Sequence, residues 1–312
     1  MHRRLFLMLL TPLVLLHAGC SANDGVHPEE AGKVTWLRDL DTALAESARS
    51  DKPVFALFQE IPGCAGCKQF GHDVLSDPLV VAGIEGLFTP LLIHNNKPGK
   101  DAEALQRFDE PAWNYQVVRI LDAHGADIIP RKDRVWETGP LTERMIAALK
   151  TAKRPVPPWL ALLASEHSPR LREMALAMGC FWTGERQIGQ LDGVVTTEAG
   201  FIGGREVTIV KYDPAVLSLD RLANTAAGLR CADAMYVPAD ELDAARAAGL
   251  HLEPLTGYRA APTSDQKKQL QGTSAARLKL EGAQATKVNA WIRTDPAKAA
   301  EFLTPAQAAR MR

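Results

Sequence analysis

The pattern of apolar and polar positions changes along this chain, and it predicts a mixture of strands and helices. Short apolar runs bounded by Pro, Gly or polar residues are typical of buried strands, whereas apolar residues at helical spacing indicate helices. The runs predict strands at residues 53–58, 87–93, 117–121, 174–178 and 207–211. The spacing predicts helices at residues 36–48, 160–166, 185–191, 219–229, 241–248, 284–291 and 304–311. We therefore expect an α/β part, then an α+β part, and a helix-rich C-terminal end.

Length and composition indicate an ordinary globular protein of two domains, because the 312 residues are 46% hydrophobic and 23% charged. Prolines within residues 154–159 make a stiff, extended break, where we place the domain boundary. The net charge of −1 argues against nucleic acid or an acidic membrane surface as the main partner. The expected division is a signal at residues 1–20, a tether at 21–32, a first domain at 33–153, a linker at 154–159, a second domain at 160–238 and a helix-rich C-terminal extension at 239–312.

The N-terminus carries the features of an export signal. A basic start is followed by an apolar run at residues 5–16 and by a pair of small residues before Cys20. Such a run is too short to span a membrane and is typical of a cleaved signal. The cysteine after the small pair resembles a bacterial lipoprotein box, although His17 stands where such boxes usually carry leucine. We expect export to the periplasmic side of a bacterial membrane, with a lipid anchor at Cys20.

The five cysteines are too few for a disulfide-rich scaffold, and their positions favour redox chemistry. Cys20 is assigned to the anchor and Cys64 forms a Cys-x-x-Cys pair with Cys67. Cys180 and Cys231 lie far apart in the sequence. No second Cys-x-x-Cys and no paired histidines are present to complete a zinc site. The sequence therefore predicts neither a bound metal nor a cofactor.

The Cys-x-x-Cys pair follows the strand predicted at residues 53–58 and opens a helical pattern. At a helix N-terminus Cys64 is solvent-reachable, and the amide groups there lower its pKa. Cys67 lies one helical turn in, close enough to form a disulfide and release a mixed-disulfide partner. The alternatives are a structural disulfide or half of a zinc site. The order of strand, dithiol, helix and further strands favours a redox role.

This order of elements resembles a thioredoxin fold. Residues 61–64, Ile-Pro-Gly-Cys, are similar to the Val-Pro-Gly-(Cys or Sec) motif of a group of bacterial thioredoxin-like proteins. Thioredoxin-like proteins usually carry a proline just before the strand that faces the dithiol. No proline directly precedes residues 117–121 here, and Pro111 is too early. The difference bears on peptide docking and disulfide reductase activity, not on the fold.

A second candidate site surrounds Cys180, at the turn between the strand predicted at residues 174–178 and the helix that follows. A helix N-terminus carries about half a positive charge, which favours a thiolate over a thiol. Phe181 and Trp182 follow directly and could wall an apolar slot, and Glu185 could return to the site after one helical turn. These residues supply a nucleophile, a hydrophobic pocket and a proton donor. The alternative is a buried cysteine in a packed core.

Residues 179–182, Gly-Cys-Phe-Trp, are followed by Glu185 and then by the segments 191–195, 199–204 and 207–214. In this order they resemble the catalytic half of the peptide methionine sulfoxide reductase A family, over about residues 174–222. The resemblance implies that Cys180 attacks the sulfoxide sulfur of oxidised methionine in proteins or peptides. It implies further that Phe181 and Trp182 cradle the methyl group, that Glu185 is the acid, and that a second thiol resolves the sulfenic acid. Cys231 is the candidate for that thiol; a buried cysteine at a helix end is the alternative.

The sequence also departs from the family pattern. The tyrosine of the family's Gly-Tyr-x-Gly-Gly segment is Phe201 here, so one hydroxyl is missing from the substrate pocket. The family's Thr-Gly-His loop is absent, and its Gly-Thr-Gln-Tyr-Arg-Ser stretch has no clear counterpart. Asp233, Tyr236 and Tyr258 are candidates to restore a polar contact. Loss of one oxygen donor from such a site could cost about 3 kcal/mol, or about a hundredfold in rate.

Three functions remain to be compared. The first is an exported repair enzyme that reduces methionine sulfoxide and receives electrons from the attached thioredoxin-like domain, which an upstream thiol reductant of unknown identity recharges. The second is a thiol–disulfide oxidoreductase whose second domain is a non-catalytic binding module. The third is a structural envelope lipoprotein, which the dithiol motif disfavours. The intact Gly-Cys-Phe-Trp motif favours the first.

Overall fold

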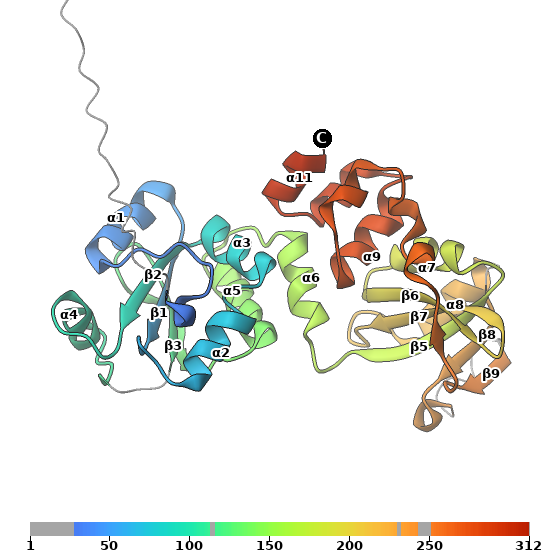
Figure 1. Ribbon diagram of the computed structural model, residues 1–312, viewed down its shortest axis with the longest axis horizontal. Coiled ribbons are helices and arrows are strands. Elements are labelled where there is room, and N and C mark those ends of the chain that lie inside the picture. The colour runs from blue at the N-terminus through green and yellow to red at the C-terminus, as the bar shows by residue number, and fades with distance from the viewer. Residues whose placement is uncertain (1–27, 113–115, 230–231, 243–250, 312) are drawn as a thin grey trace, which may run out of the picture.

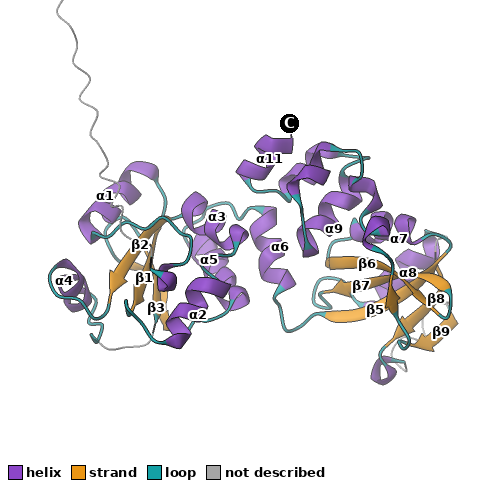
Figure 2. Cartoon of the chain, viewed as in Figure 1, coloured by secondary structure: helices purple, strands orange, loops and turns teal. Residues whose placement is uncertain are grey.

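A computed structural model of the protein describes residues 28–112, 116–229, 232–242 and 251–311. Cys20, Cys231, the expected signal and most of the helix expected at residues 241–248 lie outside these ranges. Within them, no helix is long and apolar enough to cross a membrane. The strands form two separate groups, one in each half of the molecule (Figure 2). The expected mixture of α/β and α+β architecture is confirmed.

The first sheet has four strands in the order β2-β1-β3-β4. β1 runs parallel to β2 and antiparallel to β3, and β3 runs antiparallel to β4. A parallel pair requires a crossover, which helices provide here, and β3 and β4 form a hairpin; this arrangement is the thioredoxin topology expected from the sequence. The strands are β1 (Val54–Gln59), β2 (Thr89–His94), β3 (Val117–Leu121) and β4 (Asp127–Asp133). The helices are η1 (Glu29–Ala31), α1 (Leu40–Ser50), α2 (Ala65–Asp73), α3 (Pro78–Leu87), α4 (Lys100–Arg107) and α5 (Thr138–Thr151).

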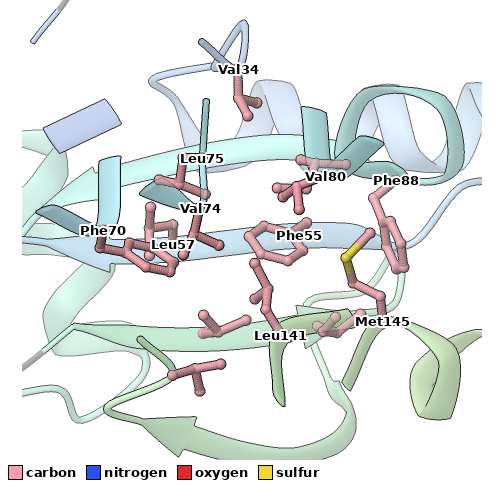
Figure 3. Close-up of a cluster of buried hydrophobic side chains, with 14 of the residues drawn as sticks. Val34, Phe55, Leu57, Phe70, Val74, Leu75, Val80, Phe88, Leu141 and Met145 are labelled. Carbon is pink, nitrogen blue, oxygen red and sulfur yellow. The ribbon is translucent and has the colours of Figure 1, made fainter. Parts of the chain in front are cut away.

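Helices cover both faces of this sheet, so β1 is buried along its whole length. Phe55 and Leu57 point to one face and contact Phe70 and Leu141, from α2 and α5 (Figure 3). Ala56 and Phe58 point to the opposite face, toward α1 and α4. The strand expected at residues 87–93 begins two residues late, because α3 continues to Leu87 and Phe88 caps it.

Helix α6 (Pro158–Glu166) lies between the two halves of the molecule (Figure 1). Its residues Trp159, Leu160 and Leu163 pack in the core of the first sheet. Leu162 contacts Val195 and Ala283 on the other side. The helix begins at Pro158, at the end of the proline-rich segment, and its hydrophobic contacts reach both halves.

The second sheet has six strands in the order β10-β6-β7-β5-β8-β9. Its neighbouring strands are antiparallel, except that β8 and β9 run parallel. Met174 and Leu176 on the central strand β5 pack against Ile188 and Leu222 of the helices. The strands are β5 (Arg172–Met178), β6 (Val194–Ile202), β7 (Arg205–Tyr212), β8 (Ala232–Val237), β9 (His251–Pro254) and β10 (Arg259–Ala260), and the helices are α7 (Phe181–Gly189) and α8 (Leu219–Gly228).

The C-terminal part is helical at its end, as expected, but it also completes the second sheet. β9 and β10, which the sequence pattern did not predict, form the two edges of that sheet. The buried helix α9 (Gly282–Trp291) packs against α7 and β6. From this helix, Lys287 donates to the carbonyl oxygens of Gly189 and Leu191 at the end of α7. The remaining helices are η2 (Ala239–Glu241), η3 (Thr263–Asp265), η4 (Lys268–Leu270), η5 (Ser274–Leu278), α9 (Gly282–Trp291), α10 (Pro296–Glu301) and α11 (Pro305–Met311).

Candidate active site

Cys180 lies between the end of β5 and the first residue of α7, at the N-cap position of that helix, and is half-buried. Its carbonyl oxygen accepts the backbone N–H groups of Thr183 and Gly184, which starts the helix directly after the cysteine. Gly184 allows the first turn to lie close to the sheet, since a Cβ there would stand 2.2 Å from Thr208 Oγ1. The sequence thus fixes the thiol at the strand-to-helix turn that the motif predicted.

Three aromatic rings pack together at the start of α7, which Cys180 caps. The rings of Phe181 and Trp182 have centroids 5.7 Å apart, and those of Phe181 and Phe201 lie 5.6 Å apart, both in edge-to-face geometry. Such pairs are worth about 0.5–1.5 kcal/mol beyond the area they bury, so these contacts stabilise the cluster. Phe181 is buried, whereas Trp182 and Phe201 are partly exposed. The structure therefore brings together all three predicted substrate-binding residues.

The segment that includes β10 and η3 forms one wall of this cluster. The indole Nε1 of Trp182 donates to the carbonyl oxygen of Asp265 at 3.0 Å. The guanidinium carbon of Arg259 lies 4.9 Å from the ring centroid of Phe201, and Nζ of Lys268 lies 4.7 Å from that of Trp182. The C-terminal part thus holds two of the three rings in place.

Glu206 places a carboxylate at the start of α7, a position that was not predicted from the sequence. Its Oε2 accepts the backbone N–H of Phe181 at 2.8 Å, at the start of α7 and one residue from Cys180. Gly203 and Gly204 have positive φ and make the tight turn between β6 and β7, so Glu206 pairs directly with Phe201 across the hairpin. A two-glycine hairpin fixes this register, which is the sequence signal that could have found it.

Glu185, the predicted acid, forms a buried ion pair with Lys267. Its side chain is 0% exposed, with Oε1 2.5 Å from Nζ of Lys267 and Oε2 accepting the Lys267 backbone N–H at 2.9 Å. Burial raises the pKa of Glu185, and the charge and hydrogen bonds of Lys267 oppose that rise. Both carboxylate oxygens are therefore engaged in joining α7 to the C-terminal part.

The other candidates are placed as follows. Asp233 is exposed and pairs with Arg205. Tyr236 is buried within β8, where it pairs with β5. Tyr258 donates to Oε1 of Glu198 at 2.7 Å, and its ring lies so close to β6 that a Cβ at position 200 would stand 2.2 Å from it. The predicted resolving residue, Cys231, lies outside the described ranges.

The predicted dithiol sits at the start of α2. Cys64 is the N-cap and is exposed, Cys67 is 4% exposed, and their sulfur atoms are 3.6 Å apart. Hydrogen bonds from the Cys67 backbone and side chain lower the pKa of Cys64. Burial raises the pKa of Cys67 to about 12. One accessible, acidic thiol beside one buried, weakly acidic thiol is the arrangement that thiol–disulfide exchange requires.

Part of the chain is similar to a known family. A family model described as peptide methionine sulfoxide reductase matches residues 172–216, which include Cys180, Phe201 and Glu206. Peptide methionine sulfoxide reductase MsrA 1 of Rhizobium meliloti is 36% identical over 72 residues, 18% of this chain and 33% of its own length. MsrA of Salmonella newport is 36% identical over 100 residues, 25% of this chain and 47% of its own length. The aligned segments therefore span only a third to a half of these relatives.

Two solved structures also align with the chain. Methionine sulfoxide reductase A of Corynebacterium diphtheriae aligns with a TM-score of 0.32 and 19% identity, over 38% of this chain and 82% of that one. A protein titled DsbH Oxidoreductase aligns with a TM-score of 0.32 and 19% identity, over 43% of this chain and 96% of that one.

Among the described residues, no group of three or more His, Cys, Asp or Glu side chains is placed to hold a metal ion.

Proposed function

We propose that this chain reduces methionine sulfoxide in oxidised proteins and peptides, with Cys180 as the nucleophile. The observation that carries the proposal is the meeting of a half-buried thiol, three edge-to-face aromatic rings and the carboxylate of Glu206 at the start of α7. The similarity of residues 172–216 to the peptide methionine sulfoxide reductase family supports it. By the same family resemblance the preferred substrate is the S-sulfoxide.

In the proposed reaction, the aromatic cluster takes the methyl group of the substrate and Glu206 donates a proton to the sulfoxide oxygen. The Cys180 thiolate attacks the sulfoxide sulfur and forms a sulfur–sulfur bond, while the protonated oxygen takes a second proton from solvent and leaves as water. A water molecule then attacks the Cys180 sulfur, methionine leaves with the electron pair of the sulfur–sulfur bond, and Cys180 is left as sulfenic acid with release of one proton. Methionine is reduced by two electrons and the cysteine is oxidised by two. Glu206 is proposed for the acid role in place of Glu185, because both oxygens of Glu185 are engaged by Lys267.

The dithiol is proposed to return the electrons. A second thiol, proposed to be Cys231, condenses with the sulfenic acid, releases water and leaves a disulfide. The Cys64 thiolate attacks that disulfide, and Cys67 then closes the Cys64–Cys67 disulfide and frees the second domain. An upstream thiol reductant must reduce this last disulfide again.

We also propose that the protein is exported and held at the periplasmic side of a membrane by a lipid on Cys20.

The two redox centres begin helices in different halves of the molecule, α2 in one and α7 in the other (Figure 1). Electron delivery therefore requires either a movement of one half against the other or an encounter between two molecules. If the halves move within one chain, the effective concentration of reductant is on the order of millimolar.

Steady-state turnover tests the proposal. The purified chain is mixed with dithiothreitol and a methionine sulfoxide peptide, and loss of the oxygen is followed by mass spectrometry. We expect turnover in the wild type and in Cys64→Ser, because dithiothreitol replaces the dithiol. Absence of turnover at high enzyme concentration would contradict the proposal. It would leave the second function, a thiol–disulfide oxidoreductase with a binding module, which Cys64→Ser inactivates toward insulin disulfides.

Replacement of Glu206 by Gln is expected to lower turnover by about a hundredfold or more, since a positioned proton donor contributes about that much. The amide still accepts the Phe181 N–H, so the start of α7 is kept. The matched control is Glu173→Gln on β5, whose carboxylate pairs with Lys211 at 3.6 Å. If Glu206→Gln and Glu173→Gln turn over at the same rate, Glu206 is not the proton donor.

A further inference from the structure

We infer that Glu30, from the N-terminal helix η1, is a positioning residue of the dithiol that fixes the loop before Cys64 against Cys67. Glu30 is 3% exposed, although glutamate side chains are almost never fully buried unless they have a polar partner. Its Oε1 accepts the backbone N–H of Gly63, the residue directly before Cys64, at 2.8 Å. The inference rests on the proposed redox function of the first domain.

The Gly63 backbone is packed directly against the buried thiol. A Cβ on Gly63 would stand 2.8 Å from Cys67 Cβ and 3.2 Å from Cys67 Sγ. A shift of Gly63 therefore changes the position of Cys64 relative to Cys67, whose sulfur atoms are 3.6 Å apart. The hydrogen bond from the Gly63 N–H to Glu30 opposes such a shift.

A second side chain holds the other end of the same loop. Oδ1 of Asn96, which follows β2, accepts the backbone N–H of Ile61 at 3.2 Å, and its Nδ2 donates to the Pro62 carbonyl at 3.3 Å. Residues 61–63 are thus fixed from two sides by side chains that are distant in sequence. Of the two, only Glu30 is buried and contacts the residue next to Cys64.

The segment that carries Glu30 is hydrogen-bonded to β1 and packs closely against α2. The Glu30 carbonyl oxygen accepts Nε2 of Gln59, and the Ala31 carbonyl accepts Nε1 of Trp36 at 2.8 Å. Gly71 of α2 allows this close approach, since a Cβ there would stand 1.9 Å from the Glu29 carbonyl oxygen. Residues 29–31 are therefore packed against the elements that carry the dithiol.

The effect of Glu30 on Cys64 comes through geometry. The backbone N–H groups of Cys67 and Gly66 are among the groups that lower the pKa of Cys64, and they act only while Cys64 keeps its place. Other charges also face the site. The carboxylate of Glu60 opposes the lowering, and Lys68 pairs with Glu29 at 3.2 Å. A test must therefore separate the Glu30 hydrogen bond from the Glu30 charge.

The comparison of Glu30→Gln with Glu30→Met makes this separation. Both variants are neutral and of similar volume, but only Gln keeps an oxygen that accepts the Gly63 N–H. In the reduced full chain, the alkylation rate of Cys64 by iodoacetamide is measured against pH, with the Cys64 peptide quantified by mass spectrometry. We expect the apparent pKa of Cys64 to be about half a unit or more higher in Glu30→Met than in Glu30→Gln.

Glu29→Gln is the matched control, because the exposed carboxylate of Glu29 pairs with Lys68 at 3.2 Å; this variant should leave the profile unchanged. Identical profiles for Glu30→Met and Glu30→Gln would overturn the inference. If Glu30→Met does not fold, Glu30→Asp replaces it. Its shorter carboxylate withdraws from Gly63, so a Cys64 profile identical to the wild type would overturn the inference equally. No sulfoxide is used, so failure here and failure of the proposed reaction are distinguished.

Discussion

Replacement of Cys180 by Ser is expected to abolish methionine sulfoxide reduction, with a loss of at least about a thousandfold, because a hydroxyl cannot replace the thiolate as nucleophile. The substitution keeps the size of the side chain, and Cys180 is half-buried at a helix N-cap, a position that serine favours. The fold should therefore be retained. The measurement is steady-state turnover of a methionine sulfoxide peptide with dithiothreitol as reductant.

The control for this prediction is Cys67→Ser, which removes a thiol from the other redox centre and should leave turnover driven by dithiothreitol close to the wild type. A Cys180→Ser protein that retains a tenth or more of the activity would place the nucleophile elsewhere in the chain. Loss of activity in both variants would show that the dithiol itself takes part in the chemical step.

Replacement of Lys267 by Met is expected to give the largest loss of stability, about 3–5 kcal/mol in the free energy of unfolding near neutral pH. The variant leaves the carboxylate of Glu185, which is 0% exposed, without its ionic partner. The backbone N–H of Lys267 still donates to Glu185, so the variant removes the ionic contact and keeps the position of the segment. The measurement is urea unfolding, with Lys211→Met as control, because Lys211 is exposed and pairs with Glu173 at 3.6 Å.

The loss in Lys267→Met should depend on pH in a definite direction. Burial already raises the pKa of Glu185, and removal of the Lys267 charge raises it further. In the variant, the pKa of Glu185 is higher in the folded state than in the unfolded state, where it is about 4.3. Between these two pKa values the folded state binds the proton more tightly, so the free energy of unfolding falls as pH rises. The destabilisation should be smaller at about pH 5 than at about pH 8. Equal losses at both would contradict this assignment of the buried charge.

Much of the site could be predicted from local sequence, because its main parts are neighbours in the chain. Cys180, Phe181 and Trp182 follow each other at a strand-to-helix turn, and the structure brings Phe201 to them as expected. The Cys64–Cys67 pair likewise opens a helix after a buried strand. Apolar runs and helix-opening motifs are short-range signals that do not depend on tertiary contacts.

The parts that the sequence analysis missed depend on contacts between distant segments. Glu206 reaches the start of α7 only through the register of the β6–β7 hairpin. Lys267 meets Glu185 across 82 residues, and Glu30 meets Gly63 across 33. β10 has only two residues, too few for an alternating pattern. Glu206 has a local signal in the two-glycine turn of its hairpin, whereas Lys267 and Glu30 are brought to their partners by the packing of the whole fold, which no local pattern indicates.

A single-turnover experiment tests the central claim most directly. The fully reduced chain and a Cys64→Ser/Cys67→Ser double variant are mixed with excess methionine sulfoxide peptide without added reductant, and the methionine peptide formed is counted. We predict about one equivalent from the double variant, where oxidised Cys180 stops the reaction, and about two from the wild type, where the dithiol restores Cys180 once. No methionine peptide from either protein would contradict a reductase function. Equal amounts from both would contradict electron delivery by the first domain.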